Sequence, residues 1–166
     1  MAEEDKFIKA FDAYADGIFR YCFFRVFNRE LAKDLVQDTF MRAWEYASKG
    51  NKIENLKAFL YKIAHNLVVD ESRKAKEYSL DALISQGFDV PSEGNQIRDI
   101  EAKEVLAVVS LLEEEYRDAV QMRHVEGFSP KEIAQITGES ENVISVRIHR
   151  GLAKLRTLMS NQKKDG

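Results

Sequence analysis

The side chains best suited to chemistry lie near the end of the chain, and their chemistry is contact with nucleic acid. Between Glu141 and Asp165 the sequence contains six lysine and arginine residues and no acidic residue. Lysine and arginine neutralise phosphates, whereas amides, hydroxyls and guanidinium groups also form hydrogen bonds with base edges. This stretch therefore predicts an element that faces a phosphate backbone.

A helix must carry these residues, because apolar positions recur at helical spacing. With successive residues about 100° apart, one stripe contains Ile144, Ile148, Gly151, Leu155 and Met159, and we expect it to pack on a core. The opposite side, here called the recognition face, holds Asn142, Ser145, Val146, His149, Arg150 and Ala153. Arg147 and Lys154 flank it and are predicted to bind phosphates rather than bases. An ordinary amphipathic helix with a solvated basic side is the alternative.

The preceding residues predict a helix-turn-helix. Ser129 is suited to an N-cap, Pro130 to the first helical position and Glu132 to the third, which completes a capping box. Gly138 can adopt the left-handed conformation that ends a helix, and a second helix is expected to begin near residues 140–142.

Upstream of this motif, apolar residues spaced by three and four predict two scaffold helices; they are Val105, Val109, Leu112, Tyr116 and Val120. We therefore expect a helical domain over residues 102–160, followed by a polar tail over residues 161–166. His124 is expected at a helix end before Gly127, as a surface or packing residue.

The charge of the whole chain, −3, conceals an uneven distribution of charge along the sequence. Residues 76–118 contain 4 Lys and Arg against 11 Asp and Glu, whereas residues 119–166 contain 8 against 5. The acidic part includes "EYSLDALISQGFDVPSEGN", which has no sustained helical period. We expect a linker over residues 77–101 between two helical halves.

Composition favours an all-α protein of two small helical domains joined by a flexible acidic linker. The chain has 166 residues, only two prolines and no stretch long and apolar enough for a membrane span, so we expect it in the cytosol. Cys22 is the single cysteine and lies in an apolar run, which predicts a buried, inert thiol. The three histidines lack metal-ligand spacing, and no metal or other cofactor is expected.

The first half, residues 1–76, is expected to form a domain of three helices. An aromatic-rich helix over residues 7–27 is followed by one over residues 29–47, whose predicted core stripe contains Leu31, Leu35, Thr39, Ala43 and Trp44. The opposite side exposes Asp34, Gln37, Asp38, Met41 and Arg42, which by physical criteria alone is a solvated surface. The third helix begins after the loop "SKGNKIEN" and is amphipathic and basic.

Taken in order, "DLVQDTFMRAWEY", "KGNKIENLKAFLYKIAHNLVVDESRK" and the helix-turn-helix resemble the extracytoplasmic-function (ECF) sigma factors of bacterial RNA polymerase, over nearly the whole chain. The resemblance implies a subunit that binds core polymerase and promoter DNA and directs initiation without catalytic chemistry of its own. The first motif then implies contact with the clamp coiled coil of the β′ subunit. The implied core-binding face consists of Asp34, Gln37, Asp38 and Met41.

The second motif resembles the element that melts and recognises the upstream half of the minus-ten promoter box. A base would leave the stack and enter a pocket at the loop from Gly50 to Asn55. The implied contacts, here called the minus-ten set, are Asn51, Lys52, Asn55, Lys62, His65, Asn66 and Arg73. Amide groups would bond the base, while Lys62 and Arg73 would hold phosphates.

The helix-turn-helix resembles the domain that recognises the minus-thirty-five box, with matches at Ser145, Val146, Arg147, His149 and Arg150. Many relatives have lysine or arginine and then serine where this chain has Ser145 and Val146. Because Val146 suits a thymine methyl, we expect an altered box at that step. Relatives usually have Leu-Pro where this chain has Leu112 and Glu113.

Two other classes of function stay open at this stage. A conventional helix-turn-helix regulator would bind duplex DNA as a dimer and would not need the basic segment around Asn66. A sigma-like decoy would bind polymerase through the Asp34 side and would tolerate loss of Arg150. An enzyme is disfavoured because the sequence has no recognisable catalytic arrangement. The resemblance also implies the β flap as a polymerase contact and allows an anti-sigma factor as a partner.

Overall fold

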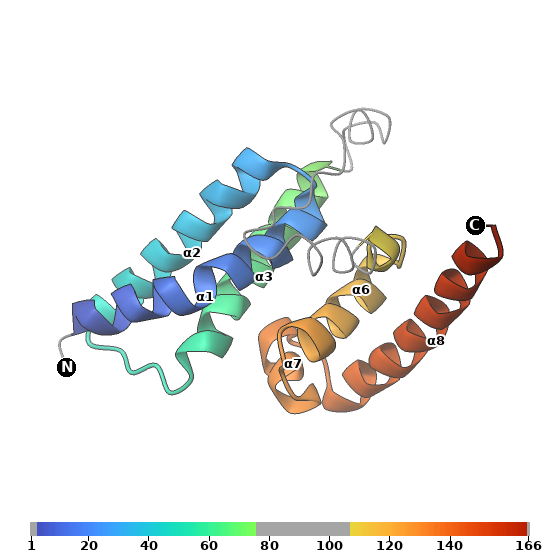
Figure 1. Ribbon diagram of the computed structural model, residues 1–166. Helices are drawn as coiled ribbons and strands as arrows, with labels where there is room; N and C mark the ends of the chain where they lie inside the picture. The colour runs from blue at the N-terminus through green and yellow to red at the C-terminus, as the bar shows by residue number, and fades with distance from the viewer. Residues whose placement is uncertain (1–2, 76–106, 166) are drawn as a thin grey trace. The chain divides into compact units, whose positions relative to one another are not determined.

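The computed structural model describes residues 3–75 and 107–165, so the predicted linker over residues 77–101 lies outside the described residues. The chain divides into two compact units, Met1–Gly87 and Phe88–Gly166, and each is considered by itself. Helices and turns account for both described ranges, within which no strand occurs (Figure 1). This confirms the all-α prediction.

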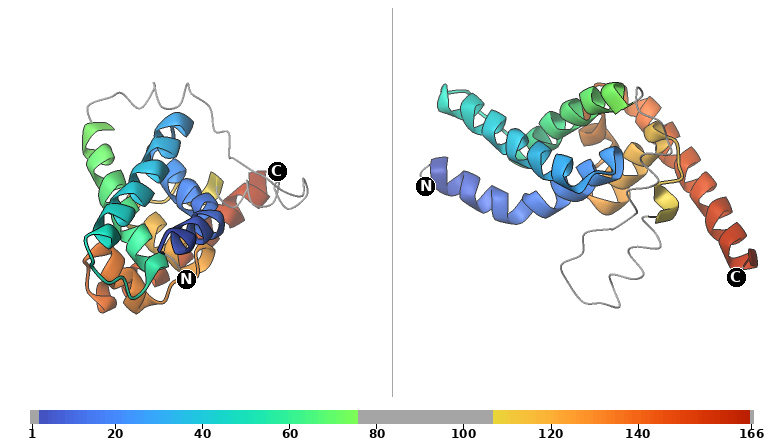
Figure 2. Two further views of the ribbon diagram at one scale, coloured as in Figure 1. Left: turned by 90° about the vertical axis from the view of Figure 1, so that its left-hand side faces the viewer. Right: turned by 90° about the horizontal axis from the view of Figure 1, so that it is seen from above.

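The first unit consists of three helices that each pack against the other two (Figures 1 and 2). They are α1 (Glu3–Val26), α2 (Arg29–Ser48) and α3 (Leu56–Ala75). The turn between α1 and α2 is short because Phe27 adopts a positive φ of 52° and Asn28 caps α2 by accepting a hydrogen bond from Leu31 N at 3.1 Å. These local features fold α2 back along α1.

Aromatic side chains fill the core of the first unit and join its helices. Ile18, Tyr21 and Phe24 of α1 are fully buried, as are Leu60 and Tyr61 of α3; this buried apolar area is the main source of stability for a unit of this size. Along the α1–α2 seam, edge-to-face pairs join Phe7 to Trp44 at 5.2 Å and Phe11 to Phe40 at 5.0 Å.

The predicted core stripe of α2 is correct at three of its five positions. Leu35, Thr39 and Ala43 are buried, and the hydroxyl of Thr39 donates to the carbonyl of Leu35 at 2.7 Å. Leu31 is half-buried. The prediction of Trp44 as a core residue is wrong, since its side chain packs on Phe7 but retains 36% exposure. The α1–α2 seam therefore lies to one side of the predicted stripe.

Cys22 is fully buried in α1, and desolvation raises the pKa of its thiol from 9.0 to about 12 despite the opposing effect of Arg25. We expect no modification of Cys22 by iodoacetamide at pH 8 in the native protein, because neither access nor thiolate is available. Mass spectrometry should find complete modification in guanidinium.

Raising the pH from 9 toward 12 should also destabilise the first unit, because the thiolate forms more easily in the unfolded chain. Rapid native labelling at pH 8 would contradict this account.

The second unit contains α6 (Glu114–Val120), the π-helical segment η1 (Gln121–Val125), α7 (Pro130–Thr137) and α8 (Glu141–Asp165). Sequence periodicity predicted helix in the region of α6 but not its widening into η1. The backbone of Glu126 donates to the carbonyl of Gln121 at 3.0 Å, which closes the wider π turn. Gln121 is fully buried there, and His124 is exposed near the end of the segment, as predicted.

The helix-turn-helix begins and turns where the sequence predicted. Ser129 Oγ accepts from Glu132 N at 3.1 Å, and Glu132 Oε1 accepts from Ser129 N at 3.0 Å, which completes the capping box. Gly138 ends α7 with φ of 81°, a conformation that non-glycine residues rarely adopt. The hydroxyl of Ser140 then accepts from Val143 N at 3.2 Å and caps α8.

Helix α8 is one uninterrupted helix that extends well past its contacts with α6 and α7 (Figure 1). Ile144 and Gly151 of the predicted stripe are buried and Ile148 and Leu155 half-buried, but Met159 is 38% exposed. The stripe therefore packs fully only over its first turns. Residues 161–165, predicted as a polar tail, continue the helix.

Candidate nucleic-acid and polymerase interfaces

The recognition face of α8 is exposed along its whole length. Asn142, Ser145, Val146, His149, Arg150 and Ala153 are all exposed. The capped turn at Ser140 and the burial of Ile144 fix the rotation of the helix, so these side chains share the side that faces away from the core. The arrangement offers amide, hydroxyl, imidazole and guanidinium groups beside two apolar side chains, Val146 and Ala153, a set that can contact base edges.

The two flanking cations have partners within the protein that sequence analysis did not anticipate. Arg147 lies 3.6 Å from Glu115 and 3.6 Å from Glu139. Lys154 Nζ lies 3.3 Å from Glu113 Oε1 and 4.4 Å from the centre of the Tyr116 ring. Both predicted phosphate ligands are thus engaged by the acidic start of α6. Glu113, at the position where the family resemblance led us to expect proline, is one of these partners.

The core-binding face of α2 is also exposed. Asp34, Gln37 and Asp38 lie on the outer side of the helix, and Met41 is 61% exposed. Two carboxylates next to a solvated thioether form a surface with both charge and apolar area. Such a face can remain solvated, and Met41 also gives it adaptable apolar area that a protein partner could cover.

The α3 members of the minus-ten set divide by exposure. Lys62 and Asn66 are exposed and one turn apart, so they share a face of α3, and Arg73 is exposed near its end. His65 is half-buried, and its Nδ1 lies 2.9 Å from the hydroxyl of Tyr21 on α1. The structure therefore gives His65 a role in joining α3 to α1, whereas Asn66 and Lys62 point to solvent.

The loop members of the set also have structural roles. Asn55 Oδ1 accepts from Ala58 N at 3.1 Å and caps α3, and Asn51 Nδ2 donates to the carbonyl of Tyr46 at 3.1 Å. Lys52 is exposed between them. Two of the amides expected to bond a base thus shape the loop, whereas the third, Asn66, is exposed on α3.

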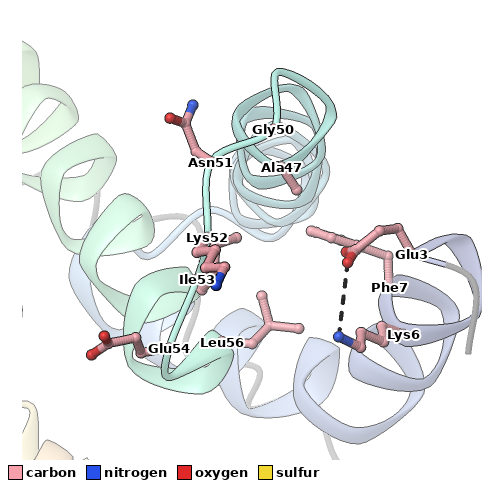
Figure 3. A pocket seen from close by; sticks show the side chains of 10 residues that line it. All are labelled: Glu3, Lys6, Phe7, Ala47, Gly50, Asn51, Lys52, Ile53, Glu54 and Leu56. Carbon is pink, nitrogen blue, oxygen red and sulfur yellow. Dashed lines mark ion pairs between the residues drawn. The ribbon is translucent and has the colours of Figure 1, made fainter.

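A cavity of about 700 Å³ lies on the inner side of this loop (Figure 3). Phe7 of α1 and Leu56 of α3 point toward it from opposite sides, the Glu3–Lys6 ion pair (3.8 Å) lies at its edge, and Asn51 points away. These contributions from α1 were not predictable from the sequence, because no local pattern indicates which distant helix end meets the loop.

No helix in residues 3–75 or 107–165 is long and apolar enough to cross a membrane. In the same ranges, no group of three or more His, Cys, Asp or Glu side chains could hold a metal ion.

Two protein families match this chain, and together they cover most of it. Residues 10–78 match Sigma-70 region 2, and residues 102–155 match Sigma-70, region 4. Among solved structures, the sigma factor RpoE of Bartonella quintana, crystallised with the anti-sigma factor NepR, is similar with a TM-score of 0.75 and 24% identity, over 93% of this chain and 97% of that one. CnrH, solved with the cytosolic domain of CnrY, has a TM-score of 0.69 and 19% identity, over 96% of this chain and 91% of that one. These likenesses concern the fold.

Sequence relatives match across both units as well. The ECF RNA polymerase sigma factor SigW of Bacillus subtilis is 31% identical, over 93% of this chain and 89% of SigW. The RNA polymerase sigma factor YlaC of the same organism is 25% identical, over 99% of this chain and 98% of YlaC. Identity at this level over both units is consistent with the order of motifs found in the sequence. The chain therefore belongs to the ECF RNA polymerase sigma factors.

Proposed function

We propose that this sigma factor binds core RNA polymerase and selects promoters by contacting a minus-thirty-five box with α8 and melting a minus-ten box with the first unit. The observation that carries the proposal is the exposed recognition face on a capped helix that follows a glycine turn. In helix-turn-helix proteins the second helix enters the major groove and contacts base edges. Catalysis would reside in the polymerase core.

Binding to the polymerase would use two surfaces. The core-binding face of α2 would dock on the β′ clamp coiled coil through Asp34, Gln37, Asp38 and Met41. The β flap would dock on the second unit, where a groove of about 410 Å³ lies between the turn before α6 and the later part of α8. Leu111 at this groove is 62% exposed, which supports an apolar partner there.

Promoter opening would use the exposed side of α3 and the loop before it. Asn66 would bond a captured base, with Asn51, Asn55 and His65 shaping the site. Lys52, Lys62 and Arg73 would hold the single-stranded backbone. Unstacking one base costs a few kcal/mol, which stacking and hydrogen bonds to the captured base can offset. An anti-sigma factor is a further expected partner, because the similar structure of RpoE contains one.

The test of this function is run-off transcription from a genomic fragment library with core polymerase plus this chain. Specific start sites, absent with core polymerase alone, are the expected result. Duplex binding by the isolated chain as a dimer, without effect on start sites, would instead indicate a conventional regulator. Polymerase binding without any promoter preference would indicate a decoy.

Replacing Arg150 with alanine should lower the preference of the holoenzyme for promoters with the native minus-thirty-five box by about tenfold, because a well-made base contact contributes roughly 1–3 kcal/mol of discrimination. Competitive transcription from native and scrambled upstream boxes measures this. Arg156→Ala is the matched control, since it removes the same charge from an exposed position further along α8. Equal losses in both variants would assign the effect to net charge rather than base contact.

Replacing Asn66 with alanine should reduce promoter opening by about tenfold and leave initial docking nearly unchanged, because the lost hydrogen bonds form only with an unstacked base. Permanganate footprinting measures opening, and band-shift assays at low temperature measure docking. Asp70→Ala, one turn further along α3 and also exposed, is the control. A parallel loss of docking and opening would remove Asn66 from the melting step.

A further inference from the structure

Arg147 connects three segments of the second unit. Its Nη2 lies 3.6 Å from Glu115 Oε2 at the start of α6, and its Nη1 lies 3.6 Å from Glu139 Oε1 in the turn before α8. Only 25% of the arginine side chain is exposed, against 47% and 44% for the two glutamates. We call these three residues the Arg147 bridge. It joins α6, the turn and the recognition helix at one guanidinium.

We propose that Arg147 is a positioning residue for minus-thirty-five recognition, which holds α8 at a fixed angle to α6 and does not bind a phosphate. From the sequence alone, Arg147 was expected to bind a phosphate. The inference rests on the proposed function and names a determinant of specificity within it.

The charge of the bridge supports positioning over phosphate binding. One guanidinium between two carboxylates gives the three groups of the bridge a formal charge of −1, so the positive charge of Arg147 is already compensated within the protein. Each exposed pair alone contributes little stability, but a guanidinium shared by two carboxylates from different segments restricts their relative movement. The fork of Arg147, with its two terminal nitrogens directed to separate partners, suits this role better than a lysine would.

The surroundings of the bridge explain how it would affect recognition. A hollow of about 310 Å³ lies beside the bridge, between the start of α6 and α8. Both Glu115 and Arg147 line it. Asn142, Val146 and Arg150 of the recognition face line the same hollow. A change in the distance between α6 and α8 would therefore displace the side chains that contact bases.

The experiment uses the holoenzyme assembled from core polymerase and the full chain. Its binding to duplex promoter fragments is measured with a native and with a scrambled upstream box, each over a series of salt concentrations. The variants are Arg147→Met and the double variant Glu115→Gln/Glu139→Gln. The matched control is Glu114→Gln/Glu141→Gln, which removes two negative charges from neighbouring exposed positions outside the bridge. Glutamine preserves side-chain shape at these exposed sites, and circular dichroism checks that helicity is retained.

Both bridge variants are expected to lose about tenfold in preference for the native box, the scale of one misaligned base contact, with an unchanged salt slope. The control should keep its preference. A salt slope reduced by about 0.9 in Arg147→Met would identify a phosphate ligand and overturn the inference. Tighter binding of the double variant to both fragments, with preference retained, would also overturn it. Absence of any preference in the unmodified holoenzyme would refute the proposed function itself.

Discussion

Replacing Asp34 with lysine is expected to weaken binding of this sigma factor to core RNA polymerase by about a hundredfold. Asp34 is exposed on the core-binding face of α2 beside Asp38, and Met41 follows one turn later. Reversing one charge replaces attraction by repulsion at the proposed contact, and single interface residues commonly contribute losses of this size. Titration of fluorescently labelled chain with core polymerase measures the dissociation constant.

The matched control for this change is Asp16→Lys, which reverses an exposed carboxylate on α1. We expect it to bind core polymerase like the unmodified chain at physiological salt, where charges more than about 8 Å apart are largely screened. If Asp34→Lys binds equally well, the clamp contact does not involve this face. A loss shared by both variants would reflect net charge alone.

Replacing Gly151 with alanine is expected to destabilise the second unit by about 1–3 kcal/mol, although alanine is the better helix former by about 1 kcal/mol. A Cβ at this position would lie 2.5 Å from Val120 Cγ2, 3.4 Å from the carbonyl of Tyr116 and 3.5 Å from its Cβ. Val120 is β-branched and buried, so it cannot rotate away without cost. Separation of α6 and α8 is the expected response.

Hydrogen exchange with mass spectrometry can measure this effect, because peptides from α1–α3 serve as an internal control. Amides of α6 and α8 should exchange about tenfold or more faster in Gly151→Ala. Adding Val120→Ala removes the clashing methyl group, so the double variant should be more stable than the sum of the two single changes predicts. Additive losses would show that the clash with Val120 is not the cause.

Features set by neighbouring residues were predictable from the sequence. The capping box of Ser129 and Glu132 and the left-handed turn at Gly138 depend on groups within a few residues of each other. The exposure of the recognition face was also predictable, because helical periodicity placed Ile144 and Gly151 on the opposite, core-facing stripe. Both residues are buried in the structure.

Features set by packing between distant segments were not predictable. Lys154 meets Glu113 across 41 residues, and Tyr21 meets His65 across 44. A long flexible cation can reach several carboxylates, so its partner depends on how closely α6 approaches α8. The π-helical turn at Gln121 has no sequence signal either, since the segment has ordinary helical periodicity. Roles of individual residues in contacts with DNA and polymerase stay predictions that the experiments above test.

The uninterrupted course of α8 has a mechanical consequence. Its 25 residues span on the order of 37 Å as a single rod, and the tight contact at Gly151 acts as a fulcrum near the middle. The segment before Gly151 carries the recognition face, and the longer segment after it extends past the contacts with α6 and α7. A sideways displacement of the far arm would therefore move the near arm in the opposite direction, because the helix between them has no break to absorb it.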